Sequence, residues 1–233
     1  MKFIKKLLAI VCALALVMTT VAVSISVFAD DSVVMPKKMV VIDDFENGVT
    51  YWRAQDTSPA NIEFSASSQY AYGSSGNSLK AILTDKWDGV KTYNKTAGIK
   101  YTGLAFWLYL PEDLGVGLIV KVSLKSATDT TAVNHEYIVP ATQLKAGEQV
   151  VLVPWTSFPD ASSKATHFES EGAYISQITL QVAAKPSAAK TVYIDNVCVY
   201  RDDNAPVEMV PSTKSMPENY LLIDDFNAES NLG

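Results

Sequence analysis

Two groups of aromatic residues have the spacing that stacking chemistry requires. Trp107 and Tyr109 are two positions apart in a β-rich run, so their rings share one face of one strand. Trp87 and Tyr93 form a second group within DKWDGVKTY, residues 85–93. Flat rings stack against the C–H faces of pyranoses, while amides and charged groups bind the hydroxyls. Two alternatives stay open: Trp107 and Tyr109 cover the back of a sandwich or pack beneath a loop, and Trp87 caps the core at a turn.

The carboxylates near the start do not have the arrangement that glycoside hydrolysis needs. Asp43 and Asp44 are adjacent in IDDFE, and adjacent strand residues point to opposite faces. A hydrolase instead holds two carboxyl groups about 5–9 Å apart across one sugar. The sequence also lacks G-x-S-x-G, H-E-x-x-H and a phosphate-binding glycine loop. We therefore expect no enzyme activity from these residues.

These side chains must be positioned by strands, because helical periodicity is almost absent beyond the first segment. Short β-rich runs recur between turn signals, which is typical of an all-β, two-sheet antiparallel β-sandwich of the jelly-roll type. Alternation places Leu104, Phe106 and Leu108 on a core face, and it places Gln181 and Lys121 on faces that point away from the core. The expected runs are 40–45, 61–67, 78–83, 90–94, 101–110, 117–125, 134–139, 149–155, 174–183 and 191–200.

The N-terminal segment reads as an export signal. Lys2, Lys5 and Lys6 precede an apolar run, and Val27-Phe28-Ala29 is a small-residue cleavage site, so residues 1–29 are predicted to be removed. An uncleaved anchor is the alternative. We expect a secreted, extracellular protein that has no membrane contact after cleavage, and attachment to the cell surface is an open alternative. The net charge of −6 argues against nucleic acid as a partner. Cys198 alternates with two valines, which indicates a buried, inert thiol.

The sequence IDDF occurs twice, at residues 42–45 and 223–226, which indicates a repeated module. The first copy opens a predicted β-sandwich module over residues 38–201. A linker rich in Pro, Ser and Thr follows at 202–220, and residues 221–233 read as the truncated start of a second copy. We therefore expect a monomeric module within a multi-module chain.

Several segments resemble family 11 carbohydrate-binding modules, β-jelly-roll domains of bacterial plant-cell-wall-degrading systems. The similar segments are MVVIDDFENGVTYW (39–52), YGSSGNSLKAIL (72–83), VLVPWTSF (151–158) and ISQITLQVAAKPSAAKTVYIDNVCVY (175–200). DDFE openings and IDN closings also occur in other galactose-binding-like sandwiches, some without a known sugar ligand. The resemblance implies a sheet that binds single β-glucan chains and a structural calcium ion. It also places Val182 where the family has a sugar-stacking tyrosine.

The resemblance, taken with the residues, gives two candidate sites. The carbohydrate-binding set is Trp87, Tyr93, Trp107, Tyr109, His135 and Gln181, in which His135 lies on a strand that is central in the resembling fold. The resembling fold also brings the two ends of the module together near Asn77. Calcium takes six to eight oxygen ligands, and the expected set is Glu46, Asp195, Asp44 and Asn77. The alternative is that these carboxylates only cap turns.

The sequence thus predicts a non-catalytic module that binds a plant polysaccharide, with β-glucan as the favoured class, and holds a larger parent protein on its substrate. Two other functions stay open. One is a structural or adhesive repeat of a cell-surface protein, which would follow if Trp107 and Tyr109 are covered rather than lining a groove. The other is the N-terminal module of a glycoside hydrolase whose catalytic domain lies beyond residue 233.

Overall fold

The computed structural model describes residues 33–55, 62–92, 97–126, 131–159 and 163–202. The predicted export signal, most of the linker, the second IDDF copy and Tyr93 lie outside these residues. Within them, no helix is long and apolar enough to cross a membrane.

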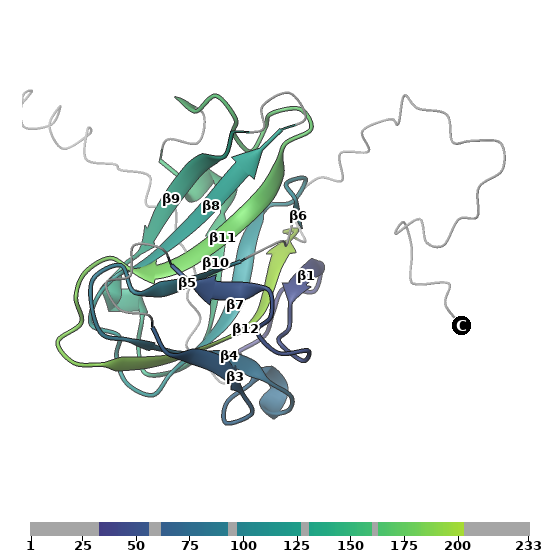
Figure 1. Ribbon diagram of the computed structural model, residues 1–233. Coiled ribbons are helices and arrows are strands. Elements are labelled where there is room, and N and C mark those ends of the chain that lie inside the picture. The colour runs from purple at the N-terminus through teal and green to yellow at the C-terminus, as the bar shows by residue number, and fades with distance from the viewer. Residues whose placement is uncertain (1–32, 56–61, 93–96, 127–130, 160–162, 203–233) are drawn as a thin grey trace, which may run out of the picture. The chain divides into compact units, whose positions relative to one another are not determined.

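The described residues form two antiparallel sheets (Figure 1). The first, called sheet A, has the strand order β10-β7-β12-β4-β3, and β1 also pairs with β12. The C-terminal half of β12 pairs with β1 and its N-terminal half with β4, so one long strand joins the two ends of the module. The strands of sheet A are β1 (Met39–Asp43), β3 (Phe64–Ser67), β4 (Ser78–Leu83), β7 (Gly103–Leu110), β10 (Gly147–Pro154) and β12 (Lys190–Tyr200).

The second sheet, called sheet B, has the order β2-β5-β11-β8-β9, and β6 pairs with the start of β11. Its strands are β2 (Trp52–Ala54), β5 (Gly89–Thr92), β6 (Ala97–Gly98), β8 (Leu118–Lys125), β9 (Val133–Val139) and β11 (Tyr174–Val182). Three short 3₁₀ helices complete the described elements: η1 (Tyr72–Ser74), η2 (Ala141–Gln143) and η3 (Trp155–Ser157). The predicted all-β, two-sheet sandwich is confirmed.

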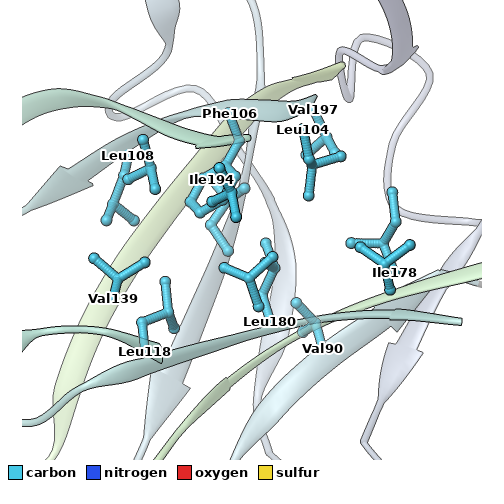
Figure 2. Packing of buried hydrophobic residues seen from close by; sticks show 14 of the residues in the cluster. Val90, Leu104, Phe106, Leu108, Leu118, Val139, Ile178, Leu180, Ile194 and Val197 are labelled. Carbon is cyan, nitrogen blue, oxygen red and sulfur yellow. The ribbon is translucent and has the colours of Figure 1, made fainter. Parts of the chain in front are cut away.

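The core lies between the two sheets because each strand turns its aliphatic positions inward. Figure 2 shows Leu104, Phe106 and Leu108 of sheet A facing Leu118 and Leu180 of sheet B. All five are buried, and burying a side chain of this size stabilises the fold by about 1.5–3 kcal/mol. The alternation predicted for β7, β8 and β11 is therefore confirmed.

A second apolar cluster covers the outer face of sheet A. It joins Trp107, Tyr193, Cys198 and Tyr200 to Met35, which precedes β1. Burial raises the pKa of the Cys198 thiol to about 12, so the thiol stays protonated and is a poor nucleophile. The outer faces of the two sheets therefore differ, since that of sheet A is an apolar layer under additional chain.

Candidate carbohydrate-binding surface and calcium site

Trp107 cannot stack on a sugar, because none of its surface is exposed. The ring lies in the buried cluster on the outer face of sheet A, to which Met35 also belongs. The Met35 backbone N–H donates to the Tyr72 hydroxyl at 3.3 Å, which ties the covering segment to the loop before β4. The prediction of Trp107 as a sugar contact is wrong. Alternation along a strand shows which side of the sheet a residue faces, but it does not show whether that side is covered.

Tyr109 shares the Trp107 face of β7 and is half-buried. The Tyr70 ring stacks on Tyr109 with the ring centroids 4.0 Å apart, and Tyr193 meets it edge-on at 6.0 Å. The ring is therefore one member of an aromatic cluster. The open platform expected from Trp107 and Tyr109 together is not formed.

His135 is also completely buried, and its prediction as a sugar contact is wrong. Its Nε2 lies 2.8 Å from the Thr166 backbone carbonyl. A carbonyl only accepts hydrogen bonds, so Nε2 carries the proton and donates. The ring also packs 5.0 Å from Phe168. His135 therefore anchors the loop at 163–170, a role that strand periodicity does not reveal.

The outer face of sheet B carries polar side chains in cross-strand register. Strand pairing aligns one row across five strands, from β2 through β5, β11 and β8 to β9. Lys121 and Glu136 of this row form an ion pair at 2.8 Å. The row consists of Arg53, Lys91, Thr179, Lys121 and Glu136. Such a face offers donors and acceptors for sugar hydroxyls.

Access to this row is greatest at its two ends. Arg53 and Glu136 are exposed, and the Lys121 side chain keeps 17 % of its surface accessible. Thr179 and Lys91, in the middle, are nearly buried. Gln181 lies on the same face, as predicted, but only 2 % of it is exposed. Its Oε1 accepts a 2.8 Å hydrogen bond from Gln55 Nε2. A ligand would therefore meet the flanks of the row first.

Trp87 lies at the end of the β5–β11 pair, in the turn between β4 and β5. Its backbone N–H donates to the Val182 carbonyl, and its ring is half-buried, with Lys86 Nζ 4.4 Å from the ring centroid. The Trp87 φ angle of 71° is unusual for a bulky residue. Residues held in such conformations cluster at functional sites, where surrounding structure enforces them.

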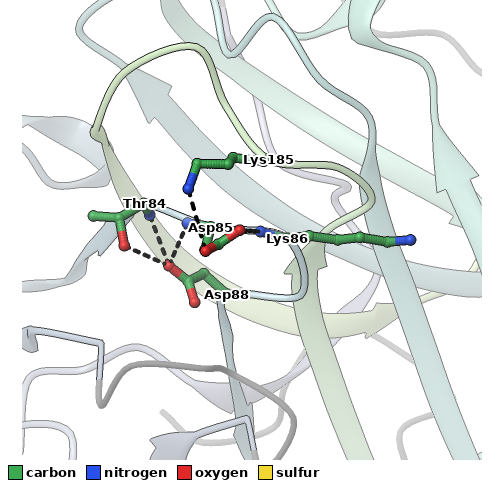
Figure 3. A network of polar contacts seen from close by, with 5 residues as sticks. All are labelled: Thr84, Asp85, Lys86, Asp88 and Lys185. Carbon is green, nitrogen blue, oxygen red and sulfur yellow. Dashed lines mark hydrogen bonds and ion pairs between the residues drawn. The ribbon is translucent and has the colours of Figure 1, made fainter.

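The enforcing structure is a network around Asp88, a fully buried carboxylate (Figure 3). Its Oδ2 accepts hydrogen bonds from the Thr84 backbone N–H, the Thr84 hydroxyl and the Asp85 backbone N–H at 2.7, 3.0 and 2.8 Å. The Lys185 ammonium reaches Asp85 at 3.3 Å. The turn that presents Trp87 is therefore fixed before any ligand arrives.

Val182 faces the core and is completely buried. The expectation that Val182 takes the place of a sugar-stacking tyrosine is therefore wrong. The neighbouring position that faces outward is Gln181.

The predicted calcium ligands lie in the region where β1 ends and β12 bulges. Only 3 % of Asp195 is exposed, and its two oxygens accept from the backbone N–H groups of Tyr72 and Asn196 at 2.9 and 2.6 Å. Burial first, and then the nearby carboxylates of Glu46 and Asp44, raise the Asp195 pKa to about 6, against the two hydrogen bonds that lower it.

The remaining predicted ligands are held by backbone contacts. Glu46 Oε1 accepts from the Asn77 backbone N–H at 2.9 Å, and Asp44 Oδ1 accepts from the Glu46 N–H at 3.3 Å. Asn77 thus meets Glu46 through its main chain. An added Cβ on Gly76 would lie 1.9 Å from Glu46 Oε1. The glycine is what lets this carboxylate lie against the turn.

These residues fit a calcium ion in their chemistry, although they do not form a cage of side chains alone. Among the described residues, no three His, Cys, Asp or Glu side chains are grouped closely enough to hold a metal. Calcium takes backbone carbonyl and water oxygens as readily as carboxylates. One electrostatic observation favours calcium at this place. The charged groups that raise the Asp195 pKa are both carboxylates, and a divalent cation would offset the repulsion between them and Asp195.

Solved structures with a similar fold include carbohydrate-binding modules. No protein-family model matches the sequence, and no curated protein matches it. Among solved structures, the chain is similar to the family 11 carbohydrate-binding module of the cellulosomal cellulase Lic26A-Cel5E of Clostridium thermocellum. The TM-score is 0.52 with 16% identity, over 70% of this chain and 95% of that one.

A second similar structure is a family 11 module from Clostridium thermocellum in complex with a β-1,3-1,4-mixed-linked tetrasaccharide. Here the TM-score is 0.51 with 18% identity, over 72% of this chain and 97% of that one. The fold of this chain, a two-sheet β-sandwich, is thus similar to that of these two modules. At this level of identity the likeness establishes the fold alone.

Proposed function

We propose that the protein is a secreted, non-catalytic polysaccharide-binding module that uses the outer face of sheet B. The observation that carries this proposal is the registered polar row across five strands, with Trp87 fixed in a strained turn at the end of the β5–β11 pair. The similar fold of a module bound to a mixed-linked tetrasaccharide supports β-glucan as the ligand class. The module would hold a larger parent protein on its substrate.

We also propose that Asp195 and Glu46 hold a structural calcium ion, with further oxygens from Asp44, backbone carbonyls and water. The ion would join the ends of β1 and β12. A cation that binds only the folded state stabilises it by mass action.

The binding proposal is tested by electrophoresis in native gels that contain mixed-linkage β-glucan, xyloglucan or xylan. We expect β-glucan to retard the protein and Trp87→Ala to abolish that retardation, because the fixed ring is lost while the core is untouched. Tyr109→Ala is the matched control, since it removes an aromatic ring from the outer face of the opposite sheet. Retardation that is lost in Tyr109→Ala and kept in Trp87→Ala would place the site on sheet A.

One observation favours a second function, a structural or adhesive repeat of a cell-surface protein. Trp107 is completely covered and Tyr109 is stacked under Tyr70, so the aromatic pair most suited to sugar binding is occupied. Absence of retardation by every polysaccharide, from a folded protein, is the result that this second function predicts.

A further inference from the structure

A cavity of about 620 Å³ opens at the end of the sandwich where β7 begins and β10 ends. Ligand pockets in proteins commonly have volumes of about 300–1,000 Å³. None of the residues in the polar row of sheet B lines it. The lining residues are Ile99, Tyr101, Thr102, Trp155, Thr156, Phe158, Pro159, His167, Phe168 and Glu169.

The floor of this end pocket is a rigid group of aromatic rings. Trp155 stacks on Phe168 with centroids 4.4 Å apart and an interplanar angle of 8°, and Phe158 lies 5.1 Å from Phe168. The Trp155 Nε1–H donates to the Ile99 carbonyl at 3.2 Å. Trp155 and Phe168 are buried except for 8 % of their surface, and both line the pocket. The position of the indole is already fixed, which lowers the ordering cost of binding.

The rim supplies hydrogen-bonding groups. Thr102 and Thr156 carry hydroxyls, and Glu169 carries an exposed carboxylate. The His167 Nδ1 accepts from the Glu169 backbone N–H at 3.2 Å, so the proton of the neutral ring lies on Nε2, which can donate. Among the described residues that line the pocket there is no Lys or Arg. The rim thus suits a neutral ligand rich in hydroxyl groups and disfavours an anionic one.

The loop that forms the outer wall is anchored to sheet B. His135 of β9 holds the Thr166 carbonyl at 2.8 Å and packs against Phe168. Farther along the loop, the His167 backbone N–H donates to the Ser170 hydroxyl at 2.9 Å. This explains why a histidine is completely buried in β9: it fixes the wall of the pocket and acts as a positioning residue.

We propose that the end pocket is a second carbohydrate-binding site that takes a neutral pyranose, as a chain terminus or a side branch of a polysaccharide. The small exposed parts of Trp155 and Phe168, together with Tyr101, would contact the C–H face of the ring, and the rim would bind its hydroxyls. The choice of a sugar as the ligand rests on the proposed function. The site itself is separate from the outer face of sheet B.

The test is nuclear magnetic resonance of the protein titrated with methyl β-D-glucopyranoside, methyl β-D-xylopyranoside and methyl β-D-galactopyranoside. Methyl β-D-glucopyranosiduronic acid serves as the anionic comparison. The signals to follow are the Trp155 indole N–H and the amides of residues 167–170. Thr156→Arg fills the pocket from an exposed position in η3. Thr142→Arg is the matched control, because Thr142 is the exposed central residue of η2.

We expect at least one neutral glycoside to shift these signals, with the shifts lost in Thr156→Arg and kept in Thr142→Arg and in Trp87→Ala. The glucuronide should shift them less. The inference is overturned if no neutral glycoside shifts them, or if the shifts survive Thr156→Arg. Polysaccharide retardation that depends on Trp87, without any shift at the end pocket, would overturn this inference alone and leave the proposed function standing.

Discussion

At the scale of single residues, the contact between Gly76 and Glu46 gives the sharpest test of the calcium site. Gly76 and Gly73 both have positive φ angles, 88° and 70°, but only at Gly76 would a Cβ collide with Glu46, since Gly73 has nothing within 4 Å. Each alanine should cost about 1–2 kcal/mol of stability for the backbone conformation.

Only Gly76→Ala should also displace the carboxylate, and we expect a loss of calcium affinity of about tenfold or more by titration calorimetry. Equal calcium affinity in Gly76→Ala and Gly73→Ala would contradict Glu46 as a ligand.

Asp195 predicts a pH dependence with a definite sign. Its folded-state pKa of about 6 lies above the ordinary value of 3.8, so in calcium-free protein the protonated carboxyl favours folding. This stabilisation is complete below pH 3.8 and is lost as the pH rises through 6. Calcium binds the carboxylate form, so saturating calcium should restore stability at pH 7.

Differential scanning calorimetry from pH 4 to pH 8, with calcium or with a chelator, isolates this effect as the difference between the protein and Asp195→Asn. If, in the presence of the chelator, the stability difference between the protein and Asp195→Asn does not change through pH 6, the role assigned to Asp195 is contradicted.

At the scale of elements, β7 determines which outer face remains for a ligand. Trp107 belongs to the same buried cluster as Met35 on the outer face of sheet A, and its Nε1–H has no hydrogen-bond partner among the described residues. Trp107→Ala should therefore lower the free energy of unfolding by about 3–5 kcal/mol. Trp107→Phe should cost less, because it gives up no hydrogen bond.

Urea unfolding measures both variants, and native gels should show unchanged polysaccharide retardation under conditions where each is folded. If a fully stable Trp107→Phe protein were no longer retarded, Trp107 would have to be part of the binding site.

The strands that sequence predicts well are those that alternate against one shared core. β7, β8 and β11 each have eight or nine residues, and their inward positions follow the pattern. β2 and β6 are not predicted, because strands of three and two residues are too short to show a period. Tertiary pairing alone makes them strands.

Side-chain access is harder to predict than strand direction. Trp107 and Lys91 both point away from the core and are both buried, since periodicity reports direction and not what covers a face. The end pocket was missed for a related reason. Tyr101, Trp155 and Phe168 are far apart in sequence and meet only where the two sheets end, although the aromatic composition of residues 155–168 offers a weak signal.

At the scale of the whole molecule, the two sheets have different tasks. Sheet A lies under an apolar layer and joins the ends of the module through β12. Sheet B presents the polar row and Trp87, while the end pocket opens beyond the first residues of β7. A net charge of −6 disfavours anionic polymers as ligands, which agrees with the neutral polysaccharide proposed here.

The most direct test of binding on sheet B is hydrogen–deuterium exchange of the protein with and without soluble mixed-linkage β-glucan. We predict slower exchange in residues 84–92, 118–125 and 174–182, because a bound chain shields the strands that carry the polar row. Residues 103–110 and 147–154 of sheet A should be unchanged, and the end pocket would add slower exchange at 163–170. Slower exchange confined to sheet A or to the end pocket, with sheet B unaffected, would contradict the proposed site.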